Sequence, residues 1–394
     1  MVQRKPLQKI LFGSPGTGKS YKIRSIATEQ LGIELDTKTT MLTDTIKTVF
    51  HPEYTYADFM GKLMPQSQGN NVMYKFYPGH FLQALGSAYR GLDNDDGKHY
   101  LLVIDELNRG NASAIFGPVF QLLDRNDDNW SSYEINLSDL ELMALFKVMG
   151  YKPKLDGDTI LLTQKNGATL PLEKFFDQEE KLLQDSHYGP DSDHWHSRRI
   201  LIGLLRTGKI SIPPNLSILA TINTSDESIY YLDSAFKRRW DWEYVESPGV
   251  HSSPPDSLRN VILINHSGND DEDKEELQWS RCIRGMNYFI CSNSQSIRRI
   301  EDKQIGWWFI KPENEKIMSQ QIRDKLMFYL WDSVFAKDRR PLEQVISKEK
   351  NDGNDSNKLV TFADLLSHST WLMKYFHDLA PIQHASDLDD MLPF

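Results

Sequence analysis

A segment near the start of the chain carries the residues of a phosphate-binding loop. Residues 13–20 read GSPGTGKS and fill every fixed position of the pattern G-x-x-x-x-G-K-[ST]. Its glycines let backbone N–H groups close around a β-phosphate, its lysine reaches the β and γ oxygens, and its last hydroxyl binds Mg²⁺. The residues expected to hold the nucleotide are Gly13, Ser14, Pro15, Gly16, Thr17, Gly18, Lys19 and Ser20. The pattern therefore predicts a nucleoside triphosphate and Mg²⁺ as ligands, with Ser20 among the metal ligands.

A second motif supplies the carboxylates that such a site needs. Residues 101–106 read LLVIDE, an apolar run that ends in two acids. The run predicts a buried strand that delivers Asp105 to the metal side of the site. Glu106 is then the natural carboxylate to polarise the attacking water. The alternative for Glu106 is a structural one, in which it caps the helix that follows.

Three further positions fit the remaining steps of nucleotide hydrolysis. Asn223 ends an apolar run, where a neutral amide could orient the water, and Asp226 is close enough in sequence to assist. Arg238 and Arg239 follow an amphipathic stretch at 228–236 and suit an arginine finger offered to a neighbouring subunit. The alternatives are a turn residue for Asn223 and a solvated helix end for the two arginines.

The elements that position these residues alternate between strands and helices. Strands are predicted at 7–12, 48–50, 100–104, 209–212 and 216–222, and helices at 20–31, 81–89, 111–123 and 228–236. Because this alternation is typical of a parallel sheet with helices on both faces, the fold class is α/β. The helix after residue 20 also adds its N-terminal dipole to anion binding.

The chain divides, by its composition, into two domains and an insertion. Residues 1–246 form the predicted nucleotide-binding domain, and 247–394 a smaller, mostly helical region in which apolar residues recur at helical spacing over 317–334. The stretch at about 126–209 interrupts the strand–helix rhythm and predicts an insertion with helices of its own. It holds 14 acidic and 10 basic residues, so it is not an obvious DNA-binding patch.

Composition excludes several other classes of protein. No apolar run approaches the roughly 18–20 residues that span a membrane, and we expect no signal peptide because residues 1–6 contain no apolar h-region. Cys282 and Cys291 lack metal-ligand spacing; we expect both to be buried and the protein to be cytoplasmic. His187, His194 and His196 are expected at the surface. A net charge of −10 argues against a surface wholly given to nucleic acid.

The order of these motifs resembles the AAA+ ATPases, and their details resemble the McrB branch of that class. Residues 105–111 (DELNRGN) match its D-E-[IL]-N-R-x-N, and residues 223–226 (NTSD) are similar to its N-T-A-D. Residues 232–240 (LDSAFKRRW) resemble its D-x-A-[LF]-x-R-R-F, and residues 305–309 (IGWWF) its lid motif I-G-x-x-Y/F. Residues 50–59 (FHPEYTYADF) resemble its F-H-x-x-Y-x-Y-x-D-F.

The resemblance implies an AAA+ P-loop fold with a helical lid, Mg²⁺, and GTP rather than ATP. It further implies a ring of identical subunits, usually a hexamer, and a McrC-like nuclease partner in a system that restricts foreign DNA. Two departures stand out. The loop begins at Gly13, so we expect no N-terminal domain that reads modified DNA, and the insertion is not part of the family pattern. We therefore expect DNA contact through the partner, or only weakly through this chain.

Two other functions remain open from the sequence. A MoxR-like ATPase that remodels a protein partner shares much of this pattern, although residues 223–226 and the Asn108-Arg109 pair favour the McrB branch. A nucleotide-gated scaffold that hydrolyses little is disfavoured because Glu106 is present. The choice between GTP and ATP is not legible in any segment.

Overall fold

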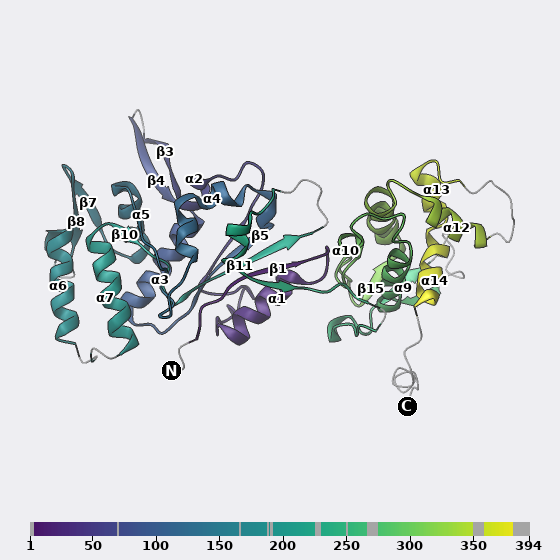
Figure 1. Ribbon diagram of the computed structural model, residues 1–394, viewed down its shortest axis with the longest axis horizontal. Helices are drawn as coiled ribbons and strands as arrows, with labels where there is room; N and C mark the ends of the chain where they lie inside the picture. The colour runs from purple at the N-terminus through teal and green to yellow at the C-terminus, as the bar shows by residue number, and fades with distance from the viewer. Residues whose placement is uncertain are drawn as a thin grey trace. The chain divides into compact units, whose positions relative to one another are not determined.

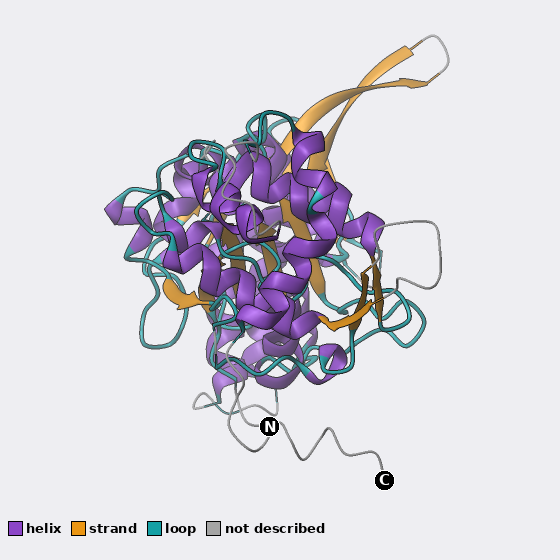
Figure 2. Ribbon diagram, turned by 90° about the vertical axis from the view of Figure 1, so that its right-hand side faces the viewer, coloured by secondary structure: helices purple, strands orange, loops and turns teal. Residues whose placement is uncertain are grey.

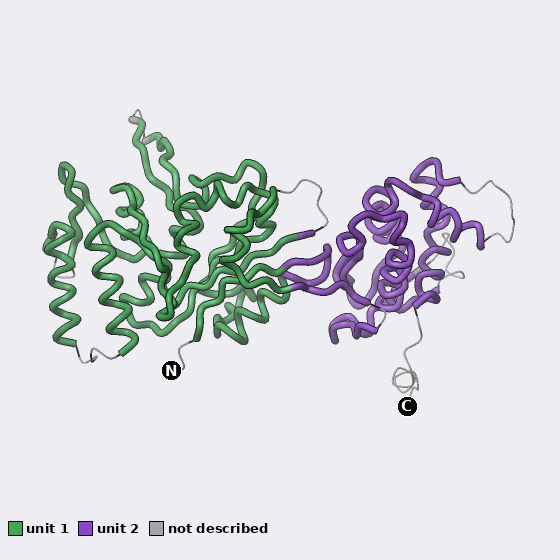
Figure 3. Tube along the Cα trace, viewed as in Figure 1, with its two compact units in different colours: residues 1–11, 20–222, 227–243 green, residues 12–19, 223–226, 244–394 purple. Residues whose placement is uncertain are grey.

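The computed structural model divides into two compact units, each described here by itself (Figure 3). The described residues are 4–68, 71–164, 167–186, 189, 192–224, 230–249, 251–265, 275–349 and 358–380. Unit 1 comprises residues 1–11, 20–222 and 227–243, and unit 2 comprises residues 12–19, 223–226 and 244–394. The chain passes from unit 1 to unit 2 for the last time between residues 243 and 244. We predicted this boundary between residues 246 and 247. Most of the phosphate loop groups with unit 2 rather than with the predicted N-terminal domain.

A five-stranded parallel sheet forms the centre of the nucleotide-binding fold, in the order β12-β1-β11-β5-β2 (Figure 1). Its strands are β1 (Gln8–Gly13), β2 (Thr45–Val49), β5 (Tyr100–Asp105), β11 (Leu216–Asn223) and β12 (Asp241–Tyr244). Both β5 and β11 are apolar and almost wholly buried, as strands covered on both faces must be. The sheet places β11 between β1 and β5, although it comes more than a hundred residues after them in the chain.

Helices cover both faces of this sheet, with α1 on one side and α2 and α4 on the other (Figure 1). Their bounds are α1 (Lys19–Ser25), α2 (Tyr56–Met60), α3 (His80–Asn94), α4 (Ala112–Phe116) and α8 (Ser234–Lys237). A π-helical turn at Ile26–Gln30 extends α1, and a 3-10 helix at Gly117–Leu123 extends α4. The predicted α/β class, with a parallel sheet between helices, is confirmed.

The helix before the arginine pair is shorter than predicted. We predicted a helix at 228–236, but α8 spans only Ser234–Lys237, and residues 225–229, with Asp226, lie outside the described residues. Asp233 sets the start, because its carboxylate accepts a hydrogen bond from the backbone N–H of Phe236 at 2.7 Å. Arg238 is the C-cap, so the arginines still stand at a helix end.

The insertion folds as a small α+β layer within unit 1. Its elements are β6 (Ile135–Asn136), α5 (Asp139–Met149), β7 (Pro153–Asp156), β8 (Thr159–Thr163), β9 (Thr169–Pro171), α6 (Leu172–Gln184), α7 (Asp193–Arg206) and β10 (Lys209–Ile210). The antiparallel sheet β7-β8-β9 was not predicted, and β10 is shorter than the predicted strand. We expected His194 at the surface, but its side chain is only 13% exposed. It lies 2.9 Å from a carboxylate oxygen of Asp95.

A long β-hairpin, absent from the sequence prediction, follows α2. Its strands β3 (Gly61–Gln68) and β4 (Asn71–Pro78) pair along their whole length and extend away from the rest of unit 1 (Figure 2). Apolar residues occupy both of its faces, and Leu63, Met64 and Tyr74 are exposed. The alternation of apolar and polar residues that marks a half-buried strand is therefore missing here, which explains why the pattern was not recognised.

Unit 2 joins a three-stranded sheet, ordered β14-β13-β15, to a layer of helices. Its strands are β13 (Ile262–Asn265), β14 (Glu275–Gln278) and β15 (Lys316–Met318). Its helices are α9 (Trp279–Ser292), α10 (Ile300–Lys303), α11 (Ser319–Gln321), α12 (Arg340–Glu349), α13 (Phe362–Ser367) and α14 (Ser369–Leu379). The apolar run from Ile317 begins as β15 and continues through π-helical turns at Ile322–Met327 and Leu330–Val334 rather than one α-helix.

One of the two cysteines lies in the hydrophobic core of unit 2. Cys282 is buried on α9, but Cys291 on the same helix is exposed, contrary to our expectation. Among the described residues, no helix is both long and apolar enough to cross a membrane.

Candidate nucleotide-binding site

The phosphate loop is a tight turn whose glycines adopt backbone angles that other residues avoid. Gly16 and Gly18 have φ values of 75° and 91°, in the left-handed region. The side chain of Lys19 is buried, and its ammonium donates to the backbone oxygens of Gly13 and Ser14, both at 2.8 Å. Phosphate oxygens are stronger, charged acceptors for the same ammonium. The loop therefore has the shape and the cation that a triphosphate requires.

A lid segment holds this loop by its carbonyl groups. We call residues 305–309, the predicted lid motif, the lid strap. The N–H of Gly306 donates to the backbone oxygen of Pro15 at 3.0 Å, and the N–H of Trp308 donates to that of Gly16 at 2.9 Å. An anion in such a loop is bound by N–H groups instead. The strap thus stabilises the loop without competing for the groups that would bind phosphate.

Two buried side chains of α9, missed by the sequence analysis, position the lid strap. The side-chain amide of Asn287 both donates to the backbone oxygen of Ile305 and accepts from its N–H, each at 2.9 Å. The indole N–H of Trp279 donates to the backbone oxygen of Trp307 at 3.1 Å. Asn287 is 1% exposed on a helix whose other buried residues are mostly apolar. A polar residue on such a face was the signal available in the sequence.

Replacing Gly306 by alanine is expected to weaken nucleotide binding by roughly tenfold to a hundredfold. A Cβ at this position would lie 2.1 Å from backbone atoms of Gly16 and Thr17. Displacing a packed backbone costs about 1–3 kcal/mol, and about 1.4 kcal/mol corresponds to a factor of ten. Titration with a fluorescent nucleotide measures the effect. Gly249→Ala is the matched control, because the nearest atom of the described residues to a Cβ there is Ser252 Oγ, at 3.6 Å. Equal affinity of both variants would contradict the role of the strap.

The end of β11 lies beside the phosphate loop. Within unit 2, the N–H of Thr224 donates to the backbone oxygen of Gly13 at 3.4 Å, which brings neighbouring Asn223, half-buried, to the loop. Asp302 also belongs to this group: burial raises its pKa, and a hydrogen bond with the Thr224 side chain opposes that shift. Asp302 is a titratable group near the loop that the sequence did not single out.

In unit 1, a threonine of β11 connects the predicted metal ligand Asp105 with the predicted catalytic residue Glu106. The hydroxyl of Thr221 donates to Asp105 Oδ1 at 3.0 Å and accepts from the backbone N–H of Glu106 at 3.2 Å. Glu106 itself has left-handed backbone angles, φ 55° and ψ 45°, at the start of a 3-10 turn at Leu107–Arg109. This turn directs the chain sharply away after β5. Thr221 shares a strand face with Asn223, two residues on, and that spacing could have identified it.

Asp105 and Ser20 provide oxygen donors suited to Mg²⁺. Among the described residues, Asp105 has no ion-pair partner, and its hydrogen-bond partner is the neutral Thr221 hydroxyl. A carboxylate held by a hydroxyl, together with a serine hydroxyl on α1, is the donor chemistry that Mg²⁺ prefers. The residues thus fit the predicted metal.

Replacing Thr221 by valine is expected to lower hydrolysis about tenfold while nucleotide binding persists. Valine keeps the shape but removes both hydrogen bonds, so Asp105 and Glu106 lose a shared anchor, at about 1–3 kcal/mol of stability. Steady-state turnover and thermal unfolding measure the two effects. Ser217→Ala is the control, since Ser217 accepts a hydrogen bond from the N–H of Leu7 at the opposite end of β11. An equal loss of turnover in both variants would show that the effect is general instability.

Other parts of the family-like motifs have structural roles here. Asn111 caps α4 by accepting a hydrogen bond from the N–H of Ala114. Phe50 is fully buried, and its N–H donates to the backbone oxygen of Asp105 at 3.0 Å. Burial raises the pKa of Tyr54 to about 12, and its hydroxyl lies 2.8 Å from His80 Nδ1. Of these residues, Phe50 bonds directly to the end of the strand that carries the acids.

The two arginines differ sharply in their surroundings. Buried Phe236 and Trp240 stack on each other beside them and fix the segment. Arg239 donates to Asp124 Oδ2 through Nε at 3.0 Å and Nη2 at 2.7 Å, and its guanidinium lies 4.1 Å from the ring centre of Phe120. Arg238 is exposed. Of the pair, Arg238 is therefore the one whose charge is presented at the surface.

Comparison with known proteins relates the chain to restriction enzymes. No family model matches it. The BsuMI type II restriction enzyme component YdiS of Bacillus subtilis (strain 168) is 25% identical over 353 residues, 84% of this chain and 80% of the relative. The EcoKMcrB subunit of a type IV methyl-directed restriction enzyme of Escherichia coli (strain K12) is 32% identical over 124 residues, 31% of this chain and 24% of the relative.

A solved structure, C. elegans PCH-2, matches over 93% of this chain and 60% of its own, with 10% identity and a TM-score of 0.21, a value too low to bear on the fold. The fold assignment comes instead from the sheet order and the phosphate loop of this chain. Both of the relatives above are components of restriction enzymes. With its P-loop α/β core and helical lid, the chain is similar to the McrB-like AAA+ proteins.

Proposed function

We propose that this protein is an oligomeric nucleoside-triphosphatase that serves as the motor subunit of a McrBC-type restriction system. It uses GTP in preference to ATP, works as a ring of identical subunits, usually a hexamer, and drives a separate McrC-like nuclease subunit in the cytoplasm against foreign DNA. It contacts DNA through that partner or only weakly by itself, consistent with its net charge of −10.

The observation that supports this proposal most is the arrangement of the phosphate loop. Its lysine is buried at the loop, its glycines adopt the left-handed angles of an anion cradle, and a lid strap holds its carbonyl edge. This arrangement suits a nucleotide enclosed between a P-loop and a lid. The relatives' names, a component and a subunit, suggest a division of labour between chains.

We assign the residues to the steps of hydrolysis as follows. Lys19 neutralises charge on the β and γ oxygens, and Glu106 accepts the proton of the attacking water, which Asn223 orients with the help of Asp226. Arg238 stabilises charge on the nucleotide of the neighbouring subunit, with Arg239 holding its segment in place. Mg²⁺, when bound by Ser20 and Asp105, supplies further neutralisation of phosphate charge.

Parallel assays of GTP and ATP hydrolysis, with and without a nuclease-bearing subunit, test the proposal. We expect GTP turnover to exceed ATP turnover and the nuclease subunit to stimulate it. Lys19→Ala serves as the blank in every assay, because any turnover that survives it comes from a contaminant. A clear preference for ATP with no response to the nuclease subunit would contradict the proposal and favour the MoxR-like alternative.

A further inference from the structure

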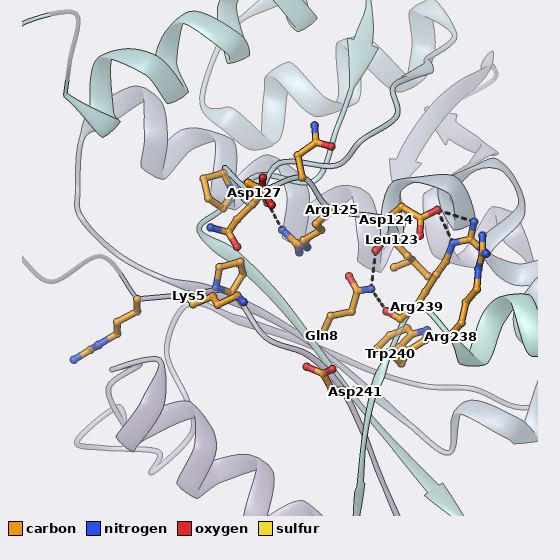
Figure 4. Close-up of a pocket in the computed structure, with 15 residues that line it drawn as sticks. Lys5, Gln8, Leu123, Asp124, Arg125, Asp127, Arg238, Arg239, Trp240 and Asp241 are labelled. Carbon is orange, nitrogen blue, oxygen red and sulfur yellow. Dashed lines mark hydrogen bonds and ion pairs between the residues drawn. The ribbon is translucent and has the colours of Figure 1, made fainter.

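Unit 1 contains a cavity of about 680 Å³ (Figure 4). Gln8 at the start of β1, Asp241 at the start of β12 and Pro214 just before β11 line it, so it lies at the N-terminal edge of these strands. β1 runs from Gln8 at this edge to Gly13, the residue with which the phosphate loop begins. A volume of this size is typical of small-molecule sites.

The cavity is cationic in an acidic protein. Its lining includes the cations Arg4, Lys5, Arg125, Arg238 and Arg239 and the acids Asp124, Asp127 and Asp241. Arg239 and Asp124 form an ion pair, so their charges neutralise each other. Four cations then face two acids, although the chain as a whole carries a net charge of −10. The local charge is therefore complementary to an anion.

Arg125 is a cation of this lining whose described hydrogen-bond partners are all neutral. Its guanidinium donates to three neutral backbone oxygens, those of Asn129 at 2.9 Å, Pro213 at 3.0 Å and Leu216 at 2.8 Å. It has no carboxylate partner in the part of the chain that the structure describes, and burial lowers its pKa to about 10. A desolvated charge with only neutral partners is costly unless an opposite charge joins it.

Three polar atoms of the lining are buried without a hydrogen-bond partner among the described residues: Gln8 Oε1, Arg125 Nε and Trp240 Nε1. The orientation of the Gln8 amide is fixed, because its Nε2 donates to the backbone oxygens of Leu123 and Arg239, which can only accept. Its Oε1 therefore needs a donor, whereas the other two atoms need acceptors. Three buried polar atoms without a partner around one cavity are uncommon in a folded protein. A ligand that satisfied them would have to offer both a hydrogen-bond donor and hydrogen-bond acceptors.

We propose that this cavity binds a phosphorylated small molecule of nucleotide size, separate from the nucleotide held by the phosphate loop. A phosphate supplies the negative charge and the acceptors for Arg125, Lys5 and Trp240. A hydroxyl or amino group on the same molecule supplies the donor for Gln8. Gln8 also bonds to the backbone of Arg239, so the bound molecule contacts the segment that carries Arg238.

Isothermal titration of the full chain carrying Lys19→Ala tests this site apart from the phosphate loop. The probes are GMP, AMP, inorganic pyrophosphate and unphosphorylated guanosine. We expect at least one of the three phosphorylated probes to bind saturably, with one molecule per chain, and guanosine to bind at least tenfold more weakly. No saturable binding of any phosphorylated probe, or equal binding of GMP and guanosine, would overturn the proposal.

Charge changes at the cavity then locate the binding. Adding Lys5→Glu should weaken the phosphorylated probe at least tenfold, whereas Lys154→Glu, an exposed lysine on β7, should leave it unchanged. Arg125→Gln keeps hydrogen-bond donors for the backbone oxygens but removes the charge, and thermal unfolding reports whether it remains folded. If Lys5→Glu has no effect, or if a single-stranded oligonucleotide competes at this site while GMP does not, the assignment is wrong. Because Lys19 is already replaced, none of these results depends on hydrolysis.

Discussion

Arg238→Ala is expected to lower nucleotide hydrolysis by roughly 10³-fold or more while nucleotide binding is retained. An arginine that stabilises charge on a neighbouring subunit's γ-phosphate acts on the transition state, so its loss affects turnover rather than affinity. Arg238 stands at the end of α8 with its side chain exposed, as a residue offered to another subunit must be. Arg90→Ala, at an exposed arginine of α3, is the control and should hydrolyse normally.

Arg239→Ala should behave differently from Arg238→Ala. Its guanidinium is committed to Asp124 and to the ring of Phe120, and its side chain is only 9% exposed. Removing it leaves Asp124 without its partner and should destabilise unit 1 by roughly 3 kcal/mol. We therefore expect a lower unfolding temperature for Arg239→Ala and a nearly unchanged one for Arg238→Ala. The opposite pattern would make Arg239 the finger.

Mixing two inactive variants tests whether the arginine acts between subunits. Arg238→Ala chains retain the phosphate loop, and Lys19→Ala chains retain the arginine, so mixed rings contain some interfaces with both. Partial recovery of hydrolysis on mixing is the expected result. Absence of recovery, in rings shown to be mixed by size and subunit labelling, would mean that Arg238 is structural or acts within its own chain.

Glu106→Gln is expected to abolish turnover while preserving or tightening nucleotide binding. Glutamine keeps the size of the side chain but cannot accept a proton from water, and general-base catalysis of this kind contributes about 10²–10⁴-fold. Nucleotide that is bound but not hydrolysed should trap the assembled ring, which gel filtration with nucleotide detects. Glu53→Gln, at an exposed glutamate of unit 1, is the control. Turnover equal to that of the parent would exclude Glu106 as the base.

Lys19→Ala provides the complementary result. Its ammonium is the cation of the phosphate loop, so its loss should remove tight nucleotide binding and turnover together. The change of the Lys19 amine and the change of the Glu106 carboxylate thus separate nucleotide binding from chemistry. Loss of binding in Glu106→Gln as well would indicate that the change disturbs the turn at Leu107–Arg109, where Glu106 has left-handed angles.

The sequence by itself determined the α/β class and the candidate nucleotide-binding residues. Both are encoded locally: the phosphate loop is a run of consecutive residues, and β5 and β11 are apolar runs that end in Asp105 and Asn223. A buried parallel strand and an anion-binding turn can each be recognised from the types of consecutive residues, without knowledge of the rest of the fold. For this reason these elements were predicted within a few residues of their observed bounds.

The tertiary structure decided what supports those residues and which of them are exposed. Thr221 meets Asp105 only because β11 pairs with β5, and Gly306 meets Gly16 across some 290 residues of sequence. The difference between Arg238 and Arg239 likewise depends on Asp124, more than a hundred residues earlier. Such contacts arise from strand order and packing between distant segments, and no local pattern of residue types records them.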